Sequence, residues 1–278
     1  MPEKIKLQPD DVELIRLLGA TFLLLDRSHI AQLFPHRSER ALNIRLTQLV
    51  RAGFLNRRQP RDFFLDPRKP LYYLGSTGQR ILDPDSNDPK IRSRLKQARD
   101  FSDTALPHFH FSTSIHVKFF AARRQYPDFD LITWIPQYAP IWAILNRHGF
   151  PLRPDGYLHY AKKPLTYHTF IEADRGTYRG QHLRKKLNAY HRYALSGRSM
   201  QHFSTPHFRV LFITETPSRA KYLVKLASPY PPDLFLVTTR QLFFSQPLFH
   251  PHWSSHSSTC FHSLDEPTEP LPDPPSPP

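Results

Sequence analysis

The stretch of residues 153–195 constrains the fold most, because it predicts two strands and a helix in close succession. Residues 156–160 and 167–173 have the composition of strands, and the Lys-Lys-Pro sequence at 162–164 between them is typical of a short turn. Together they predict a β-hairpin. The apolar residues then change to helical spacing over 178–195. A hairpin that leads directly into a helix makes this part of the chain a mixed α/β domain.

The segments on either side complete that domain. In chain order we expect a helix over 111–124, a strand over 129–135, the hairpin and its helix, a strand over 207–214, a helix over 218–227 and a strand over 233–238. Hairpin strands that feed a β-α-β unit imply a mixed sheet with helices on both faces. The fold class is therefore α+β or α/β for the chain as a whole.

Residues 9–82 predict a winged helix-turn-helix. Three helices are expected, over 10–18, over 28–34 and from a Ser38 cap to residue 52, with Asp26 or Ser28 capping the second. A strand beginning at residue 54, a basic loop, a second strand over 71–74 and a last short helix from residue 76 follow. Three helices followed by a strand, a wing and a strand is the order of this DNA-binding module.

The charge of the chain favours a polyanionic partner. Its formal net charge is +14 and its pI is near 10.0, which suits nucleic acid or an anionic membrane. The third helix is the expected recognition helix, and the predicted DNA contacts in this region are Arg37, Arg40, Asn43, Thr47 and Arg51 on or before that helix, with Arg57, Arg58, Arg61, Arg68 and Lys69 in the wing. Winged helices also serve as protein-docking modules, and this alternative stays open.

Cysteine and hydropathy exclude other classes. Cys260 is the single cysteine, so a disulfide framework and a Cys-rich zinc site are excluded, and a reducing, cytoplasmic setting is expected. The histidines around His110 and His252 match no standard zinc signature, so no zinc site is predicted. The apolar run over 17–25 is too short to span a bilayer, and a soluble, unexported protein is expected.

Composition also predicts the domain limits. We expect a winged helix-turn-helix over 1–82, a linker over 83–106, a second domain over 107–245 and a proline-rich, largely disordered tail over 246–278. Two prolines and three aspartates within 83–89 favour the boundary there. Residues 265–278 are half proline and lack apolar periodicity, as disordered segments do.

Three acidic residues form the candidate catalytic and metal site. Glu172 and Asp174 project from one side of the 167–173 strand if its extended geometry continues by one residue, and Asp155 begins the partner strand. Converging carboxylates repel one another unless a cation or proton is present. Their oxygens suit Mg²⁺ or Mn²⁺, which would activate a water beside a scissile phosphate. The alternative is that Asp155 and Asp174 are ordinary turn residues.

The order of elements resembles the PD-(D/E)-x-K nuclease-like fold, that is, a restriction-endonuclease-like domain. Pro154-Asp155 matches the first half of that motif, and Glu172 matches the acidic residue of the second half. Asp174 occupies the position of the motif's lysine, which positions the attacking water. Some members of the fold carry that lysine on the following helix, and the resemblance then makes Lys186 the candidate, with Lys185 as a weaker one.

At a closer level the chain resembles the replication-relaxation family of plasmid and mobile-element proteins. The resemblance rests on the winged helix, on the sequences from 152 to 156 and from 170 to 177, and on the helix that carries Lys186. It implies binding of DNA, with a duplex as the expected form, linked to plasmid replication or relaxation, and a homodimer and replication proteins are the candidate partners. Arg184 and Lys185 lie in a run from 179 to 198 that holds six basic residues and no acid, which suits phosphates.

Two functions therefore remain open. In the first, the second domain is a metal-dependent endonuclease or nickase that uses Asp155, Glu172, Asp174 and Lys186. In the second, the protein is a non-enzymatic DNA-binding regulator or replication accessory with a degenerate nuclease fold. A third and weaker alternative is binding to an anionic membrane.

Overall fold

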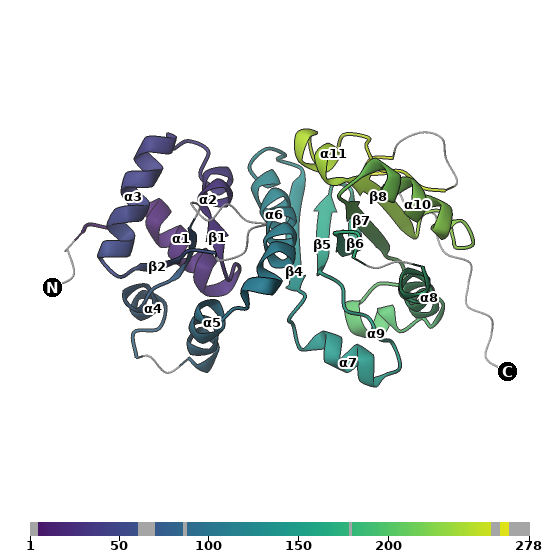
Figure 1. Ribbon diagram of the computed structural model, residues 1–278, viewed down its shortest axis with the longest axis horizontal. Coiled ribbons are helices and arrows are strands. Elements are labelled where there is room, and N and C mark those ends of the chain that lie inside the picture. The colour runs from purple at the N-terminus through teal and green to yellow at the C-terminus, as the bar shows by residue number, and fades with distance from the viewer. Residues whose placement is uncertain (1–4, 61–69, 86–87, 178–179, 257–261, 267–278) are drawn as a thin grey trace. The chain divides into compact units, whose positions relative to one another are not determined.

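The chain folds into two compact units, residues 1–121 and 122–278. The computed structural model describes residues 5–60, 70–85, 88–177, 180–256 and 262–266 (Figure 1). The predicted wing residues Arg61, Arg68 and Lys69, and the proline-rich segment 267–278, lie outside the described residues. Within the described ranges, no helix combines the length and the apolar character that crossing a membrane requires.

The first unit combines helices with a small antiparallel sheet. Its elements are α1 (Pro9–Ala20), β1 (Leu25–Asp26), α2 (Arg27–Leu33), α3 (Glu39–Arg51), β2 (Leu55–Arg58), β3 (Leu71–Leu74), α4 (Ser76–Leu82), α5 (Pro89–Arg99), a 3-10 turn (Asp103–Ala105) and α6 (Leu106–Ala122). The strand order is β1-β3-β2. Apart from β1, which the sequence does not predict, the elements from α1 to α4 follow the order expected for residues 9–82.

Local signals explain where the helices of this unit begin and which faces they bury. The Ser38 side chain accepts a hydrogen bond from the backbone N–H of Ala41 and so caps α3, and Leu42 and Leu46 point from that helix into the core. The Asp26 carboxylate caps α2 by accepting from the backbone N–H of His29 at 2.8 Å. These caps supply hydrogen bonds to groups that a helix start otherwise leaves unpaired.

The boundary between the units falls later than composition indicates. Composition predicts a linker over residues 83–106, but the eleven-residue helix α5 lies in that stretch and belongs to the first unit. Helix α6 is expected in the second domain, yet Val117 of α6 is fully buried in the core of the first unit and Phe120 packs against that core. Apolar spacing identifies α6 as a helix, but it does not tell which core receives its apolar face.

The second unit is a mixed α/β domain, as predicted. Its elements are β4 (Phe129–Pro136), α7 (Ile141–Arg147), β5 (Gly156–Lys162), β6 (Leu165–Asp174), α8 (Gln181–Leu195), α9 (Ser199–Phe203), β7 (Arg209–Thr214), α10 (Pro217–Ala227), β8 (Phe235–Thr239) and α11 (Arg240–Ser245). The sheet order is β4-β5-β6-β7-β8. Strands β4, β5 and β6 pair antiparallel, whereas β6, β7 and β8 pair parallel.

Helices α7 to α10 supply one side of the core of this unit. Side chains from these helices pack with Phe170 of β6 and Phe212 of β7 in a single apolar cluster. Along β6, Glu172 and Asp174 share the face of Phe170, because alternate residues of a strand point to the same side. The cluster therefore lies next to the two acidic residues at the end of the strand.

The segment after α11 differs from the prediction of a largely disordered tail from residue 246. Trp253 is fully buried, and Ser254 exchanges two backbone hydrogen bonds with Val237 of β8. Leu264 is also fully buried, and its carbonyl oxygen accepts a hydrogen bond from the Tyr160 hydroxyl at 2.8 Å. Proline content is a poor guide here because these few apolar side chains suffice to hold the described part of the segment against the sheet.

Candidate functional site

Asp155 lies immediately before β5, opposite Glu172 of β6. Its backbone N–H donates to the Ile171 carbonyl at 2.9 Å, which continues the pairing of the hairpin. One carboxylate oxygen of Asp155 accepts from the backbone N–H of Ala173 at 2.7 Å. Both groups tie Asp155 to β6, so its carboxylate is fixed in position and only 7% of the residue is exposed.

Glu172 is buried and receives two donors from α8. The Tyr190 hydroxyl donates to Glu172 Oε1 at 2.5 Å, and the Lys186 ammonium group forms an ion pair with Oε2. Lys186 and Tyr190 are four positions apart, so they lie on the same face of the helix. Glu172 is 2% exposed, whereas the Lys186 side chain is 27% exposed. The lysine thus links a buried carboxylate to the surface.

The electrostatics of Glu172 are dominated by burial. Removal from water raises the pKa of the Glu172 carboxyl to about 7, because the charged form is disfavoured in an apolar surrounding. The Lys186 ammonium group opposes this shift in pKa, and the nearby Asp155 charge reinforces it. Burial, followed by the Glu172 charge, also raises the pKa of the Tyr190 hydroxyl well above its ordinary value, so Tyr190 remains a donor.

Asp174 is engaged by an arginine that no motif in the sequence indicates. Arg219 of α10 binds the Asp174 carboxylate with two nitrogens, Nε at 2.6 Å and a terminal nitrogen at 3.1 Å. The Gly176 backbone N–H donates to the same carboxylate at 3.1 Å. A bidentate arginine pair of this kind fixes both oxygens. The charge of Asp174, which the predicted motif places where a lysine is expected, is therefore compensated by Arg219.

The structure does not bring the three predicted acidic residues into one compact ligand group. Among the described residues, only Asp26, His29 and His110 place three potential ligand atoms within 4.8 Å of one another. Asp155 and Glu172 do face each other across the hairpin, and their oxygens are of the type that Mg²⁺ and Mn²⁺ prefer. A metal at this position would therefore be held by these two carboxylates, without Asp174.

The exposed face of α3 is the second candidate site. Arg40, Ile44, Thr47 and Arg51 are exposed and follow one another at intervals of four, three and four residues, which places them in one stripe along the helix. Ile44 is 51% exposed in the middle of this stripe. Ile44 is not among the residues that the sequence predicts for DNA contact, although its place between Arg40 and Thr47 could have indicated it.

Four of the predicted DNA contacts have partners within the first unit, and one of them is Thr47, whose hydroxyl donates to the Asn43 carbonyl of the same helix at 2.9 Å. The Arg37 side chain donates to Asp10 Oδ2 at 2.6 Å, and the Asn43 side chain accepts from Arg27 at 3.4 Å. Arg58 donates to the carbonyl oxygen of Phe101 at 2.8 Å. These contacts hold segments of the unit together. Arg57 on β2, and Arg184 and Lys185 on α8, are exposed.

The structure thus defines a protein of two units, one with an exposed helix face rich in arginine and one with a buried acidic pair contacted by a lysine. The chain belongs to the replication-relaxation family, whose model matches residues 20–205, more than half of its length. No curated protein matches it significantly.

One solved structure shares a weak likeness with this chain. It is the restriction endonuclease FokI bound to DNA, with 9% sequence identity and a TM-score of 0.25. The alignment covers 83% of this chain and 42% of the endonuclease chain. A likeness this low does not define fold or activity, and the architecture described above rests on the strand order and register of the chain itself.

Proposed function

We propose that this protein binds duplex DNA and acts in the replication or relaxation of plasmid or mobile-element DNA. The observation that carries the proposal is the exposed stripe on α3, formed by Arg40, Ile44, Thr47 and Arg51. The stripe lies on the helix that follows α2 in a helix-turn-helix order, which is the helix that enters the major groove in such modules. Membership of the replication-relaxation family supports the same role.

The chemistry of the stripe suits base recognition. Arginine donates two hydrogen bonds to guanine, and an apolar side chain such as Ile44 contacts the methyl group of thymine. An exposed isoleucine between two arginines is costly in water and gains from such a contact. Arg57, at the end of the neighbouring hairpin strand, is exposed and suits a phosphate.

The test is an electrophoretic shift with a mixed-sequence linear duplex. The double substitution Arg40→Ala and Arg51→Ala should weaken binding by about tenfold or more, because each arginine pair with guanine contributes about 1–3 kcal/mol. The matched control is Arg80→Ala with Arg99→Ala, which removes the same charge from exposed positions on α4 and α5. An equal reduction in both double variants would reject the α3 face as the binding surface.

A second candidate function is metal-dependent nicking of DNA by the second unit. The specific observation in its favour is the ion pair of Lys186 with Glu172, beside Asp155. In this function Asp155 and Glu172 would hold an Mg²⁺ or Mn²⁺ ion, which supplies an activated water for attack on phosphorus. Lys186 would turn from Glu172 to a phosphate oxygen and stabilise the charge that develops there.

The internal contacts of the acidic residues favour a protein that binds DNA without cleaving it. The carboxylates of Asp155, Glu172 and Asp174 each accept hydrogen bonds from donors of the same unit. Glu172 is almost fully buried, so substrate reaches it only if Lys186 moves. In this form the second unit keeps a nuclease-like arrangement as a scaffold that presents the exposed basic residues of α8.

A supercoiled-plasmid assay with Mg²⁺ or Mn²⁺ separates the two forms. If the second unit nicks DNA, Asp155→Asn, Glu172→Gln and Lys186→Met should each abolish relaxation, whereas Lys185→Met on the same helix should retain it. Lys185 is exposed and supplies the matched control. Nicking is rejected if the wild-type protein does not relax the plasmid, or if all the variants relax it equally. The DNA-binding proposal is then tested by the shift assay alone.

A further inference from the structure

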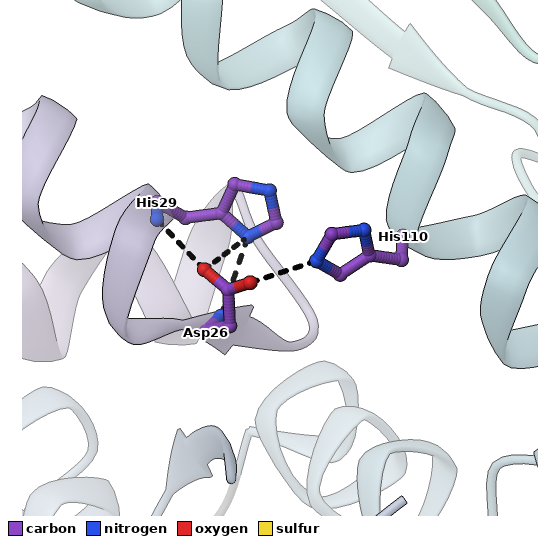
Figure 2. A group of neighbouring side chains, drawn as sticks. All are labelled: Asp26, His29 and His110. Atoms are coloured by element: carbon purple, nitrogen blue, oxygen red, sulfur yellow. Dashed lines mark hydrogen bonds and ion pairs between the residues drawn. The ribbon is translucent and has the colours of Figure 1, made fainter. Parts of the chain in front are cut away.

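The first unit contains a compact cluster of one carboxylate and two imidazoles. Asp26 is the last residue of β1, His29 lies in the first turn of α2, and His110 lies on α6. Asp26 Oδ2 is 2.8 Å from His110 Nε2, and Asp26 Oδ1 is 3.3 Å from His29 Nδ1. In Figure 2 both rings turn a nitrogen toward the carboxylate, one from each side. All three ligand atoms lie within 4.8 Å of one another.

The surroundings fix which nitrogen of His29 faces the cluster. The Ser114 hydroxyl donates to the His110 carbonyl at 2.8 Å, so its oxygen accepts from His29 Nε2, which is also 2.8 Å away. We assign the proton of His29 to Nε2 on this basis. Nδ1 is then the acceptor of the ring, and it accepts a hydrogen bond from the backbone N–H of Asp26 at 3.3 Å, which a metal ion bound at Nδ1 would replace. An imidazole whose second nitrogen donates to a fixed acceptor is the arrangement found in metal-binding histidines.

We propose that Asp26, His29 and His110 form a binding site for a divalent transition-metal ion, with Zn²⁺ as the best fit. Two imidazole nitrogens and one carboxylate oxygen suit zinc and its neighbours better than Mg²⁺ or Ca²⁺, which prefer oxygen ligands throughout. Ligand bonds of about 2.0–2.2 Å to tetrahedral zinc place the ligand atoms about 3.4 Å apart. The ligand atoms of the three residues lie within 4.8 Å of one another, so small side-chain movements bring them to this spacing.

The remaining adjustments are small. His110 Nε2 donates a hydrogen bond to Asp26 Oδ2 at 2.8 Å, so metal binding moves its proton to Nδ1 or releases it to solvent. A movement of about half an ångström then brings Nε2 to the spacing of a zinc ligand. The carboxylate keeps its capping role, because His29 N–H and the Ser28 hydroxyl both donate to Oδ1 and the metal can use Oδ2. The His110 side chain is 18% exposed, which provides an entry path and a place for a water as fourth ligand.

The placement of the ligands gives the metal a structural consequence. Asp26 and His29 belong to the start of α2, and His110 follows 84 positions after Asp26. A metal ion would therefore tie α6 to the start of the helix-turn-helix within the first unit. Because the unfolded chain lacks a preformed site, metal binding stabilises the folded unit by mass action. This inference does not depend on whether the protein binds or cleaves DNA.

The test uses the full chain after treatment with EDTA and dialysis. Titration with Co²⁺ should give one equivalent per chain with visible absorption bands of a four-coordinate site, and Zn²⁺ should displace Co²⁺ and raise the thermal unfolding midpoint. His110→Ala removes a ligand, and Asp26→Asn removes the carboxylate charge while keeping a good helix cap. Each should weaken Zn²⁺ binding by about 100-fold or more and abolish the cobalt bands.

Two histidine controls separate this cluster from surface binding. His36→Ala removes a histidine whose side chain is 61% exposed in the same unit. His148→Ala disrupts a pair of histidines, His148 and His202, whose nitrogens are 3.4 Å apart. Both variants should bind metal as the wild-type protein does. Circular dichroism and metal-free unfolding establish that His110→Ala and Asp26→Asn are folded, and if His110→Ala is unfolded then Asp26→Asn decides.

Three outcomes would overturn the proposal. The first is a wild-type protein that binds no Co²⁺ or Zn²⁺ at micromolar concentration. The second is a folded His110→Ala or Asp26→Asn variant that keeps both the cobalt spectrum and the zinc affinity. The third is an absence of binding in His148→Ala, which would place the metal at the second unit.

Discussion

At the scale of single residues, Glu172 is where burial and charge compete most directly. Its carboxyl has a pKa of about 7 in the folded protein, against an ordinary value of 4.5. The folded state therefore holds the Glu172 proton more tightly than the unfolded state does. By linkage, the stability that this carboxyl contributes is complete below pH 4.5, decreases as pH rises and is lost above about pH 7.

This linkage predicts how Glu172→Gln behaves with pH. Glutamine keeps an oxygen for the Tyr190 hydroxyl but cannot lose a proton. The free energy of unfolding of Glu172→Gln, relative to wild type, should therefore increase by about 3 kcal/mol between pH 4.5 and pH 7.5. Urea unfolding in EDTA at several pH values measures it. The effect of the Lys186 ammonium group needs no separate correction, because it lowers the pKa of Glu172 and is already contained in the value of about 7.

The matched control for that prediction is Glu215→Gln. Glu215 pairs with Arg240 at 2.9 Å, but about a third of its side chain is exposed. An exposed pair of this kind contributes little to stability. Its substitution should leave the pH dependence of unfolding unchanged. A wild-type protein and a Glu172→Gln variant with parallel pH profiles would contradict the assignment of a raised pKa to Glu172.

At the scale of elements, the close approach of β4 to the start of β5 explains the glycine after Asp155. A Cβ atom at Gly156 would lie 2.6 Å from the Trp134 ring, closer than real Cβ atoms come to any neighbour. Trp134 lies on β4, directly beside the hairpin in the sheet. Gly156 is therefore required for packing, because a larger residue at this position would collide with the Trp134 ring. Asp155, the residue before it, belongs to the candidate acidic site.

Gly156→Ala should destabilise the second unit by about 1–3 kcal/mol, the range for overpacking, because the half-buried Trp134 ring must shift to admit the new methyl group. Equilibrium unfolding by urea, followed by tryptophan fluorescence and circular dichroism, measures the change. Trp134→Phe in the Gly156→Ala background removes the ring atoms that collide and should restore part of the stability. If the double variant is no more stable than Gly156→Ala, the collision is not the cause.

Local sequence signals account for the elements that are predicted correctly. These signals act over a few residues, so they can be recognised in the sequence. They include the Ser38 cap, the spacing of the buried residues Leu42 and Leu46, and the turn of the hairpin. Helices α7, α9 and α11 escape prediction, since five to seven residues carry too little periodicity. The prediction for the described part of the tail rests on composition, which ignores the burial of Trp253.

The interactions that decide the candidate sites act over long sequence distances. Arg219 follows Asp174 by 45 positions, and His110 follows Asp26 by 84. No spacing rule connects such pairs, because tertiary packing alone brings them together. The pairing of Lys186 with Glu172 could be anticipated from the nuclease resemblance and from the helix that follows β6. The engagement of Asp174 by Arg219 could not.

At the scale of the whole molecule, both units present exposed basic residues, but of different kinds. The α3 stripe of the first unit includes Ile44 and Thr47 besides its arginines. Helix α8 of the second unit presents the adjacent basic residues Arg184 and Lys185. Binding to phosphates carries affinity and salt dependence, while binding to base edges carries sequence preference. Under the proposed function, the α3 stripe should therefore supply sequence preference, and α8 should supply affinity and salt dependence.

The salt dependence of binding separates these contributions. Substitution of both basic residues, Arg184→Ala with Lys185→Ala, should reduce the slope of log K against log salt concentration by about 0.9 for each phosphate no longer neutralised, or about 2 in total. The ratio of affinities for preferred and other duplexes should stay the same. Arg40→Ala with Arg51→Ala should instead lower that ratio, because the proposed role of these arginines is to bind base edges. Fluorescence anisotropy over a range of salt concentrations measures both quantities.

The control for this last prediction is Lys221→Ala with Lys225→Ala. These lysines are exposed on α10 of the same unit, and their substitution removes the same charge as that of the α8 pair. If net charge alone drives binding, the α10 pair will lower the slope as much as the α8 pair, and the assignment of α8 as a phosphate-binding helix is wrong. A slope that changes only for the α8 pair places the bound phosphates on the helix that also carries Lys186. Such a result would place the DNA backbone on the helix whose Lys186 pairs with Glu172, which is the helix that the plasmid-nicking assay tests.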